Sequence, residues 1–302
     1  VETLLNTLLN ADQNSFDQAW ERIAQHFDVL FTTEHSIDQL KQTILQLAVM
    51  GKLVPQDPND EPASVLLEKI AAEKEQLIKD KVIKKQKPLP PISEDEKPFE
   101  LPKGWEWVRV GNVLSLKNGH AFKSKYFCEV KTEYTLTTPG NFYEEGGFRT
   151  RGNKTKFYDG PIEPEFFLKP GDLIIPMTEQ APGLLGSAAF IPNDGNIYIH
   201  NQRLGKLTPY NLSITKSYLY IFFNAPYLRK CLASTCTGTT VRHTSPDRIL
   251  SVLVPVMSES EQLRIHNKVE SILALFEPLK SKIKESQTTQ LHLSDAMAEQ
   301  TI

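Results

Sequence analysis

The sequence predicts an α+β protein with one mixed α/β domain in its middle, flanked by N-terminal helices and by a long C-terminal coiled-coil helix. Three observations support this fold class. Of the 15 glycines, all except Gly51 lie in residues 104–238, so turn-rich structure is confined to the middle of the chain. Short apolar runs bounded by glycine, proline or asparagine also occur there, which is typical of strands. Both flanks instead space their apolar residues three or four apart, which indicates helices.

Residues 1–86 are predicted to form a helical arm. Ser15 is a good N-cap for its first helix. One face of the second helix collects the apolar residues Leu40, Ile44 and Leu47. This helix is expected to end at Gly51, which suits a helix C-terminus. Pro62 suits the first turn of a third helix, which is charged, mostly exposed and continues to Lys85.

Residues 87–102 form a proline-rich linker in this prediction. The stretch KPLPPISEDEKPFELP has prolines at positions 88, 90, 91, 98 and 102. It cannot propagate a helix and favours an extended, semi-rigid connection. We interpret it as the boundary between the arm and the following domain; a surface loop within a single domain is the alternative.

Residues 103–257 are predicted to form the mixed domain. Strands are expected over residues 105–110, 172–177, 187–192, 196–201 and 203–209. A buried helical stretch follows over residues 213–234, in which Pro226 begins a second helix. Pro246 is expected at the first position of a short, capped helical turn.

Residues 258–302 are predicted to form a long helix with a coiled-coil stripe. Eight apolar residues follow its 4-3-4-3 spacing: Ile265, Val269, Ile272, Phe276, Leu279, Ile283, Leu293 and Met297. Pro278 predicts a kink or a break within the run. Ser286 and Gln290 interrupt the stripe, either to set its register or to mark where a partner helix stops. An amphipathic helix lying on its own domain is the alternative interpretation.

The formal charge of −3 is an average over unlike regions. Residues 1–100 have 11 Lys/Arg against 18 Asp/Glu, a charge of −7. Residues 101–257 have 18 against 12, a charge of +6, and residues 258–302 have 5 against 7, a charge of −2. A basic domain between acidic helices favours a polyanionic partner for that domain.

Length and composition limit the class of protein. With 302 residues, of which 40% are hydrophobic, the chain has room for about two ordinary domains. It contains no run of roughly 18 apolar residues, so a membrane span is not expected. Three cysteines without CxxC spacing suggest neither a disulfide framework nor a zinc site. No basic-then-apolar leader opens the sequence, and we expect a cytoplasmic protein.

Motifs for catalysis are missing from the sequence. It has no GxxxxGK[ST] loop, no GxGxxG, no HExxH and no GxSxG, and no histidine lies at metal-ligand spacing from another histidine or a cysteine. Asp172 and Glu179 resemble the carboxylate pair of a metal-dependent nuclease. However, Gln180 and Ala181 follow, rather than a lysine two positions on. We therefore expect a binding protein with no metal, no cofactor and no catalytic residue.

Basic residues of the middle region gather in three loop-like segments. The first basic segment, residues 117–127, contributes Lys117, Asn118, His120, Lys123 and Lys125. The second basic segment, residues 148–158, contributes Arg149, Arg151, Lys154 and Lys156. The third basic segment, residues 237–248, contributes Thr239, Arg242 and His243, just before a predicted helix N-terminus that favours phosphate. We predict these residues as DNA contacts, because cations neutralise phosphates while Asn, His and Arg read base edges. Each segment alone is also compatible with a solvated loop.

Three stretches of the sequence resemble one protein family. They are LKQTILQLAVMGKLVPQDPNDEPASVLLEKI (40–70), LPKGWEWVRVGNV (101–113) and PVMSESEQLRIHNKVESILALFEPLKSKI (255–283). In residues and in order they are similar to the specificity (S) subunits of type I restriction-modification systems. The similarity extends from about Glu34 to Met297.

The resemblance implies DNA-sequence recognition without catalysis. In this family, target recognition domains alternate with long conserved helices, and each recognition domain reads one half of a bipartite sequence in double-stranded DNA. The paired helices space the readers and carry methylation (M) subunits, and through them restriction (R) subunits. By this resemblance, residues 101–257 are one target recognition domain and residues 258–300 the conserved helix. The segment from Ser36 to Val54 is similar to what normally follows that helix.

One departure concerns the number of recognition domains, since family members usually have two and this sequence has one. Either the chain is a fragment, as its start at Val1 rather than Met suggests, or it is a half-length subunit that works as a symmetric homodimer. The 33 residues from Ile265 to Met297 span roughly 50 Å as a helix. This length exceeds the roughly 34 Å of one DNA turn, so the helix suits a spacer.

Two other functions remain open on the sequence. The chain could act alone as a restriction endonuclease or a DNA methyltransferase, which cleavage or methyl transfer without partners would reveal. It could also be a coiled-coil assembly module whose central domain binds protein. A steep loss of affinity with added salt would distinguish DNA binding from apolar protein docking.

Overall fold

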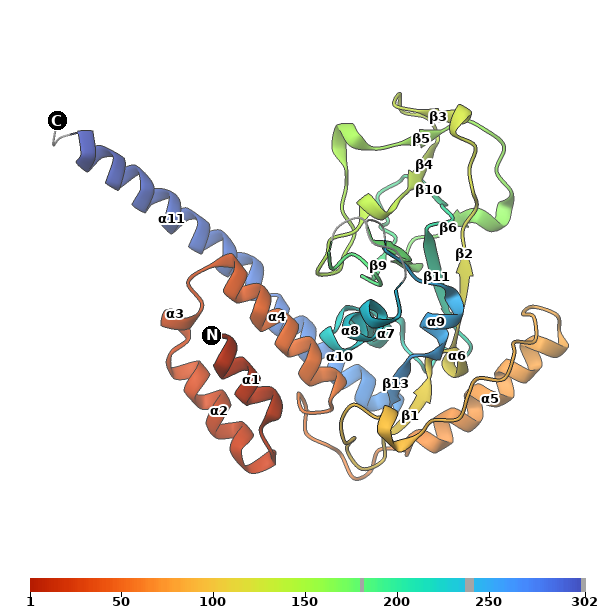
Figure 1. The fold of residues 1–302 in the computed structure, drawn as a ribbon, viewed down its shortest axis with the longest axis horizontal. Coiled ribbons are helices and arrows are strands. Elements are labelled where there is room, and N and C mark those ends of the chain that lie inside the picture. Colours follow the sequence, from red (N-terminus) through yellow and green to blue (C-terminus); the bar gives the residue numbers. More distant parts are fainter. Residues whose placement is uncertain (180–181, 237–241, 300–302) are drawn as a thin grey trace.

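The computed structural model describes residues 1–179, 182–236 and 242–299, without the side chains of residues 13–14, 235 and 293–299. Figure 1 shows a mixed domain of short strands and helices beside a helical arm, with the last helix extending away from the body to the C-terminus. The predicted α+β class, with N-terminal helices and a long C-terminal helical segment, is confirmed.

The arm begins with three short helices: α1 (Glu2–Asn10), α2 (Gln13–Gln25) and α3 (Phe27–Leu30). The prediction of Ser15 as the N-cap is wrong, because Asp12 occupies this position. Its carboxylate accepts a hydrogen bond from the Ser15 N–H at 2.8 Å. A negative charge at a helix N-terminus is further favoured by the helix dipole, so the helix begins before Ser15.

Two longer helices complete the arm: α4 (Glu34–Val49) and α5 (Ala63–Lys79). As predicted, α4 ends just before Gly51, whose φ of +70° is the left-handed conformation that glycine adopts without strain. Pro62 lies at the N-cap of α5, one residue before its first turn. The prediction that this helix continues to Lys85 is wrong, because Lys81 adopts a φ of 58° and ends it.

The strands of the mixed domain are short. They are β1 (Glu106–Arg109), β2 (Leu114–Asn118), β3 (Phe127–Cys128), β4 (Tyr134–Thr137), β5 (Phe157–Tyr158), β6 (Phe167–Leu168), β7 (Leu173–Pro176), β8 (Thr178–Glu179), β9 (Ala189–Phe190), β10 (Ile197–His200), β11 (Leu204–Pro209), β12 (Arg242–His243) and β13 (Leu253–Val256). Each of the five predicted strands coincides with one of these, namely β1, β7, β9, β10 and β11.

The strands pair in sheets that bring distant segments together. One sheet has the order β3-β5-β4-β10-β6 and another the order β2-β11-β7-β9; β1 pairs with β13 and β8 with β12. Pairing is antiparallel except between β10 and β4, where Ile197 lies opposite Tyr134. The β1–β13 pair, with Glu106 opposite Val256, joins the two ends of the domain.

The helices of the mixed domain are α6 (Val110–Val113), α7 (Lys216–Asn224), α8 (Pro226–Thr235) and α9 (Pro246–Ser251). Pro226 and Pro246 begin α8 and α9, as predicted. Short 3₁₀ turns are η1 (Glu94–Glu96), η2 (Ser124–Tyr126), η3 (Pro139–Asn141), η4 (Gly152–Lys154) and η5 (Pro164–Phe166).

The C-terminal segment consists of α10 (Glu259–Leu273) and α11 (Phe276–Glu299). The break lies at residues 274–275, so Pro278 falls in the first turn of α11. A proline there breaks no helical hydrogen bond, because the first N–H groups of a helix have no partner within it. The predicted break near Pro278 is confirmed.

Arm and mixed domain share one hydrophobic core. Its fully buried members include Ile37 and Ile44 of α4, Phe222 of α7 and Ile265 of α10. Smaller apolar clusters lie within the sheets, one around Ile174 and Tyr198 and another around Phe122, Leu136 and Tyr158. The shared core gives the mixed domain one orientation on the helices.

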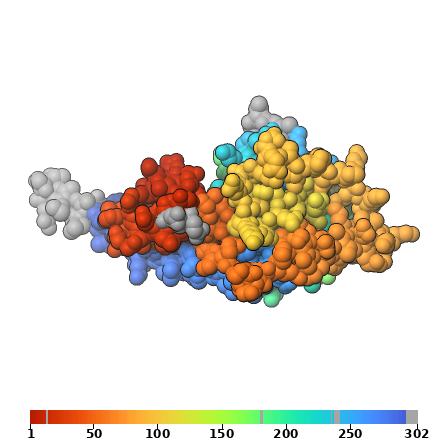
Figure 2. All heavy atoms as spheres, turned by 90° about the horizontal axis from the view of Figure 1, so that it is seen from below, coloured from red at the N-terminus to blue at the C-terminus, as the bar shows by residue number. Residues whose placement is uncertain are grey.

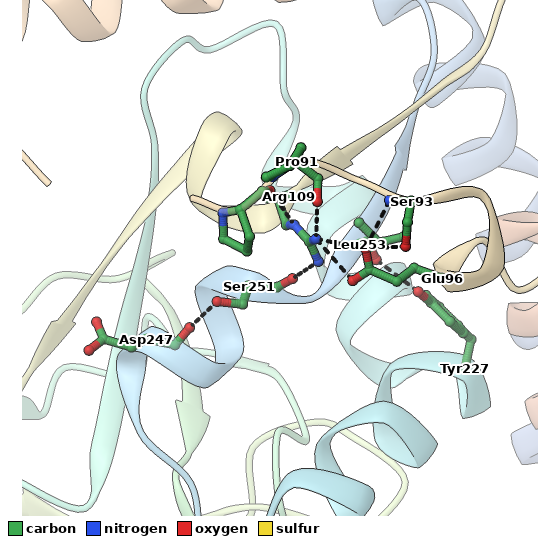
Figure 3. A network of polar contacts seen from close by, with 9 residues as sticks. Pro91, Ser93, Glu96, Arg109, Tyr227, Asp247, Ser251 and Leu253 are labelled. Atoms are coloured by element: carbon green, nitrogen blue, oxygen red, sulfur yellow. Dashed lines mark hydrogen bonds and ion pairs between the residues drawn. The ribbon is translucent and has the colours of Figure 1, made fainter. Parts of the chain in front are cut away.

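The proline-rich linker is bound to the domain by one buried guanidinium (Figure 3). Arg109, 6% exposed, donates to the carbonyl oxygens of Pro90 at 3.2 Å, Pro91 at 2.9 Å and Ser251 at 2.9 Å. It also pairs with Glu96 at 2.9 Å. The linker therefore lies along the surface of the domain.

Candidate nucleic-acid interface

The first basic segment begins where the edge strand β2 ends. Gly119 approaches the end of β10 so closely that a Cβ atom would lie 2.1 Å from the His200 carbonyl oxygen. The His120 N–H donates to the same carbonyl at 2.7 Å. Because only glycine allows this approach, the turn holds the exposed His120 ring in place, with its centroid 4.9 Å from that of Phe166.

The two histidines of this turn have opposite environments. The ring of His200 is 1% exposed, and burial lowers its pKa to about 4. Its Nε2 lies 3.0 Å from the Leu204 carbonyl oxygen, which can only accept, so the neutral ring donates there. His200 therefore supports the turn, whereas His120 faces solvent.

The polar side chains of the first basic segment are on the surface. Lys117 pairs with Glu165 at 2.6 Å, and both side chains are about half exposed. This ammonium lowers the pKa of Glu165. Asn118 and Lys123 are exposed, and Lys125 lies 4.7 Å from the ring centroid of Tyr126. An exposed ion pair contributes little to stability, so Lys117 can exchange Glu165 for another anion at low cost.

In the second basic segment, Arg149 is held by its own loop. Its backbone N–H donates to the Asn141 carbonyl at 2.7 Å, and its guanidinium donates to Glu144 at 3.0 Å. The guanidinium also lies 4.5 Å from the ring centroid of Tyr143. Arg151 packs over Gly140, where a Cβ atom would lie 2.3 Å from the guanidinium. Both arginines are thus positioned by neighbours and remain partly exposed.

The end of the second segment connects to the first. Lys154 and Lys156 are exposed, while the Lys156 carbonyl accepts from the Leu136 N–H at 2.9 Å. Tyr158 then packs on Phe122, with ring centroids 4.8 Å apart. The two segments therefore lie side by side over one apolar cluster.

The third basic segment forms β12 and pairs with β8. Arg242 lies opposite Glu179 and pairs with its carboxylate at 3.3 Å; it also donates to the Ala233 carbonyl at 2.7 Å. His243 Nδ1 lies 3.2 Å from the hydroxyl of Thr178. Thr239 lies outside the residues that the structure describes.

A residue that the sequence did not indicate connects the second and third segments. Arg229 of α8 donates to the carbonyls of Glu144 and Gly183 and, at 3.2 Å, to the Asn224 side chain. The Gly183 N–H in turn donates to Glu179 at 2.8 Å. Burial lowers the pKa of Arg229 to about 10, so it stays charged at neutral pH. An arginine within an apolar helix was the only sequence signal for this role.

The structure thus joins the three segments in a series. The second segment contacts the first through Tyr158. It is linked to the third indirectly: Arg149 pairs with Glu144 and Arg242 with Glu179, and Arg229 and Gly183 join these two carboxylate residues. Eight predicted contacts carry no carboxylate partner among the described residues: Asn118, His120, Lys123, Lys125, Arg151, Lys154, Lys156 and His243. Three others, Lys117, Arg149 and Arg242, have carboxylate partners.

The two carboxylates considered for a nuclease are engaged in ion pairs. Asp172 pairs with Lys206 at 2.6 Å and accepts from the Lys169 N–H at 2.9 Å. Glu179 pairs with Arg242, as described above. Across residues 1–179, 182–236 and 242–299, no group of three or more His, Cys, Asp or Glu side chains is placed to hold a metal ion.

The apolar stripe of the C-terminal helices packs within this chain. Ile265, Val269 and Phe276 are buried, and Ile272, Leu279 and Ile283 are partly buried against the same core. Leu40, Ile44 and Leu47 of α4 lie in that core as well. The side chains of Leu293 and Met297 lie outside the description. The stripe as a partner-binding surface stays a prediction.

Polar contacts set how α4 lies against α11. Lys280 pairs with Asp38 at 2.5 Å, and Gln287 donates to the Thr32 carbonyl at 3.4 Å. Thr33 is the N-cap of α4, so α4 begins opposite the part of α11 that contains Ser286 and Gln290. Ser286 and Gln290, the polar residues that interrupt the stripe, thus lie opposite the N-terminus of α4.

A mixed α/β domain with basic surface loops, carried on helices that share its core, has the architecture of a recognition module on a helical scaffold. In the described part of the chain, none of the helices has the length and apolarity to cross a bilayer. Residues 102–286 match the family model of the type I restriction modification DNA specificity domain, and the chain belongs to this family. The family predicted from the sequence is confirmed.

The relatives are specificity subunits. The chain is 41% identical over 305 residues to the type I restriction enzyme EcoAI specificity subunit of Escherichia coli, covering 100% of this chain and 51% of that protein. It is 36% identical over 305 residues to the EcoEI specificity subunit of the same organism, covering 99% and 51%. The chain thus spans about half the length of the curated relatives it matches.

The fold also resembles a solved structure from a study of complex assembly and conformational transition of the type I R-M system. The TM-score is 0.52 at 20% sequence identity, covering 78% of this chain and 56% of that one. This likeness concerns the fold.

Proposed function

We propose that this chain is a DNA-reading part of a type I restriction-modification specificity subunit and has no catalytic activity of its own. Its mixed domain would read one half of a bipartite target in double-stranded DNA. The observation that carries the proposal is family membership over residues 102–286. It is supported by similarity to two specificity subunits over nearly the whole of this chain, which corresponds to about half of each relative. The connected basic segments support the mixed domain as the reading surface.

We propose a division of work among the predicted contacts. Exposed lysines without carboxylate partners suit phosphates, because an ammonium on a flexible chain accommodates many backbone positions; they are Lys123, Lys125, Lys154 and Lys156. Arg149 and Arg242 suit base edges, because a guanidinium held by its neighbours can donate two parallel hydrogen bonds to guanine. The Arg149–Glu144 pair is more than one third exposed on both sides, so its exchange for a base costs little.

We further propose that α4, α10 and α11 space the reading domain and carry methylation subunits, through which restriction subunits join. The shared core supports the spacing role, because it holds the mixed domain in one orientation on these helices. Apolar residues remain on the outside of the helical scaffold: Leu263 of α10 is 55% exposed and Leu275 is 66% exposed. A second recognition domain, from further sequence or from a second copy of the chain, would read the other half of the target.

The test is to map methylated positions across a genome in cells that contain the methylation subunits, with and without this chain. We expect methylation of one defined bipartite sequence only when the chain is present. An unchanged methylation pattern would contradict the proposal. Magnesium-dependent cleavage, or methyl transfer from S-adenosylmethionine, by the purified chain alone would contradict its non-catalytic part.

A further inference from the structure

A second basic surface lies outside the mixed domain, at the end of α5. Residues 79–87, the basic turn, contain five lysines and a single acidic residue, Asp80, whereas residues 1–78 have 5 Lys/Arg against 13 Asp/Glu. The five lysines, all exposed, are Lys79, Lys81, Lys84, Lys85 and Lys87. An acidic arm therefore ends in a basic tip.

The described residues offer these cations no partner. Within the described residues, none of the five lysines has an ion pair or a side-chain hydrogen bond, and Asp80 instead accepts from Gln76 at 2.9 Å. Four of the other five lysines in residues 1–100 have partners: Lys52 binds the carbonyls of Leu9 and Ala11, Lys69 pairs with Glu61, Lys74 binds the Gly111 carbonyl and Lys97 pairs with Glu94. The fifth, Lys41, is partly buried. Within residues 1–100 the exposed, unpaired lysines are thus concentrated in the basic turn and are available to an external anion.

The backbone of the basic turn contains a strained residue, and this residue is a lysine. Lys81 has a φ of 58°, and among the described non-glycine residues it alone has a positive φ. The Val82 N–H donates to the Leu77 carbonyl at 2.9 Å, the hydrogen bond that closes a helix whose next residue is left-handed. Glycine is the usual residue there, because a side chain in this conformation meets the backbone. Stability alone does not explain a lysine at this position, so a role for its charge is indicated.

The basic turn lies close to the start of the strand that leads to the first basic segment. Gln86 accepts from the Tyr210 hydroxyl at 3.4 Å, and the Tyr210 N–H donates to the Val113 carbonyl at 3.0 Å. From there β2 runs roughly 13 Å to Asn118, at about 3.3 Å per residue. The basic turn is therefore connected to the start of the strand that ends in the first basic segment. Figures 1 and 2 show α5 along the edge of the domain, with the basic turn projecting from the body.

We propose that the basic turn binds phosphates of the DNA duplex beside the bases that the mixed domain reads. This inference rests on the proposed function and adds a contact surface outside the mixed domain. Lysines without fixed partners suit this role, since phosphate contacts position the duplex without reading its sequence. The contact would contribute equally to target and non-target DNA.

The first test measures DNA affinity of the 302-residue chain against salt concentration, with a duplex of about four helical turns. Lys84→Gln/Lys85→Gln is compared with Lys69→Gln/Lys97→Gln, which removes the same charge from lysines that already have carboxylate partners. Each lost phosphate contact makes the slope of log affinity against log salt less steep by about 0.9, so we expect a change of about 1.8 in the first variant and little in the control. Equal slopes in both variants would overturn the inference.

A second variant separates a binding role from a structural one. Lys81→Gly relieves the left-handed strain, so we expect Tm to rise by about 2 °C while the salt slope becomes less steep by about 0.9. A structural role predicts that stability and affinity change in the same direction, and that result would overturn the inference.

The same measurements distinguish this inference from the proposed function. If the unmodified chain shows no salt-dependent duplex binding, the proposed function itself fails. If it binds and Lys84→Gln/Lys85→Gln binds equally well at every salt concentration, only the role of the basic turn is refuted. If this variant binds DNA normally but no longer associates with methylation subunits, the basic turn binds an acidic protein surface and the DNA assignment is wrong.

Discussion

Replacement of Arg109 by methionine is expected to release the proline-rich linker from the domain. The guanidinium donates to the carbonyls of Pro90, Pro91 and Ser251 at 2.9 to 3.2 Å. A hydrogen bond from a charged donor contributes roughly 1.5–3 kcal/mol. Because the released linker carbonyls can turn to water, the three bonds do not add fully. We expect the free energy of unfolding to fall by about 2–4 kcal/mol.

Thermal unfolding and limited digestion with a glutamate-specific protease measure this effect. One kcal/mol lowers Tm by roughly 2–4 °C in domains of comparable size, so Arg109→Met should lower it by roughly 4–16 °C and should speed cleavage after the exposed Glu94 of the linker. Arg109→Lys keeps the charge but not the planar fork, and should show a smaller loss. Lys103→Met removes one charge from an exposed position and serves as the control. A Tm for Arg109→Met within roughly 2 °C of the unmodified chain, with unchanged cleavage, would refute the reasoning.

Three further outcomes are expected. Arg149→Ala and Arg151→Ala should each weaken target binding by about 1–3 kcal/mol if the side chain reads a base bidentately, as measured by titration with the mapped target; unchanged affinity and preference in both would remove that loop from the interface. Ile44→Ala leaves a cavity in the shared core and should cost about 2–5 kcal/mol, with arm and mixed domain still unfolding in one calorimetric transition; two separate transitions would disprove a shared core. Arg264 lowers the pKa of Asp60 below 3.8, so the pair stabilises the fold above that pH and its contribution is lost as pH falls through the lowered pKa. Asp60→Asn should therefore lower Tm at pH 7, and the gap to the unmodified chain should narrow only below about pH 3.8; a gap that does not vary with pH would contradict this.

Most of the secondary structure could be predicted because its signals are local. Gly51, Pro226 and Pro246 mark helix ends whose geometry depends on a few neighbouring residues. The two wrong predictions, Ser15 as the N-cap and a third helix that continues to Lys85, also concern local features. At each of these helix ends the sequence allows more than one position for the end. Asp12 is a cap as suitable as Ser15, and nothing in the charged run beyond Lys79 requires a left-handed residue.

The candidate interface could be predicted only as a set of segments. Loop position and charge indicate Lys123, Lys125, Lys154 and Lys156, and these four are exposed. The connection through Arg229 was not predicted, because it joins carbonyls from two loops, and backbone carbonyls carry no sequence signal.

The sequence by itself determined the family, the helical flanks around a middle region of short strands, and the separation of acidic helices from a basic domain, since each depends on residues that are neighbours in the chain. Only the tertiary structure decided which charges are free. Arg242 and Glu179, 63 residues apart, pair because β12 lies against β8, whereas Lys84 and Lys85 have no carboxylate partner among the described residues. The partner of a charged side chain depends on which distant segments fold beside it, so Arg149 and Arg242 of the mixed domain are paired with carboxylates, whereas the lysines at the end of α5 are exposed without one among the described residues.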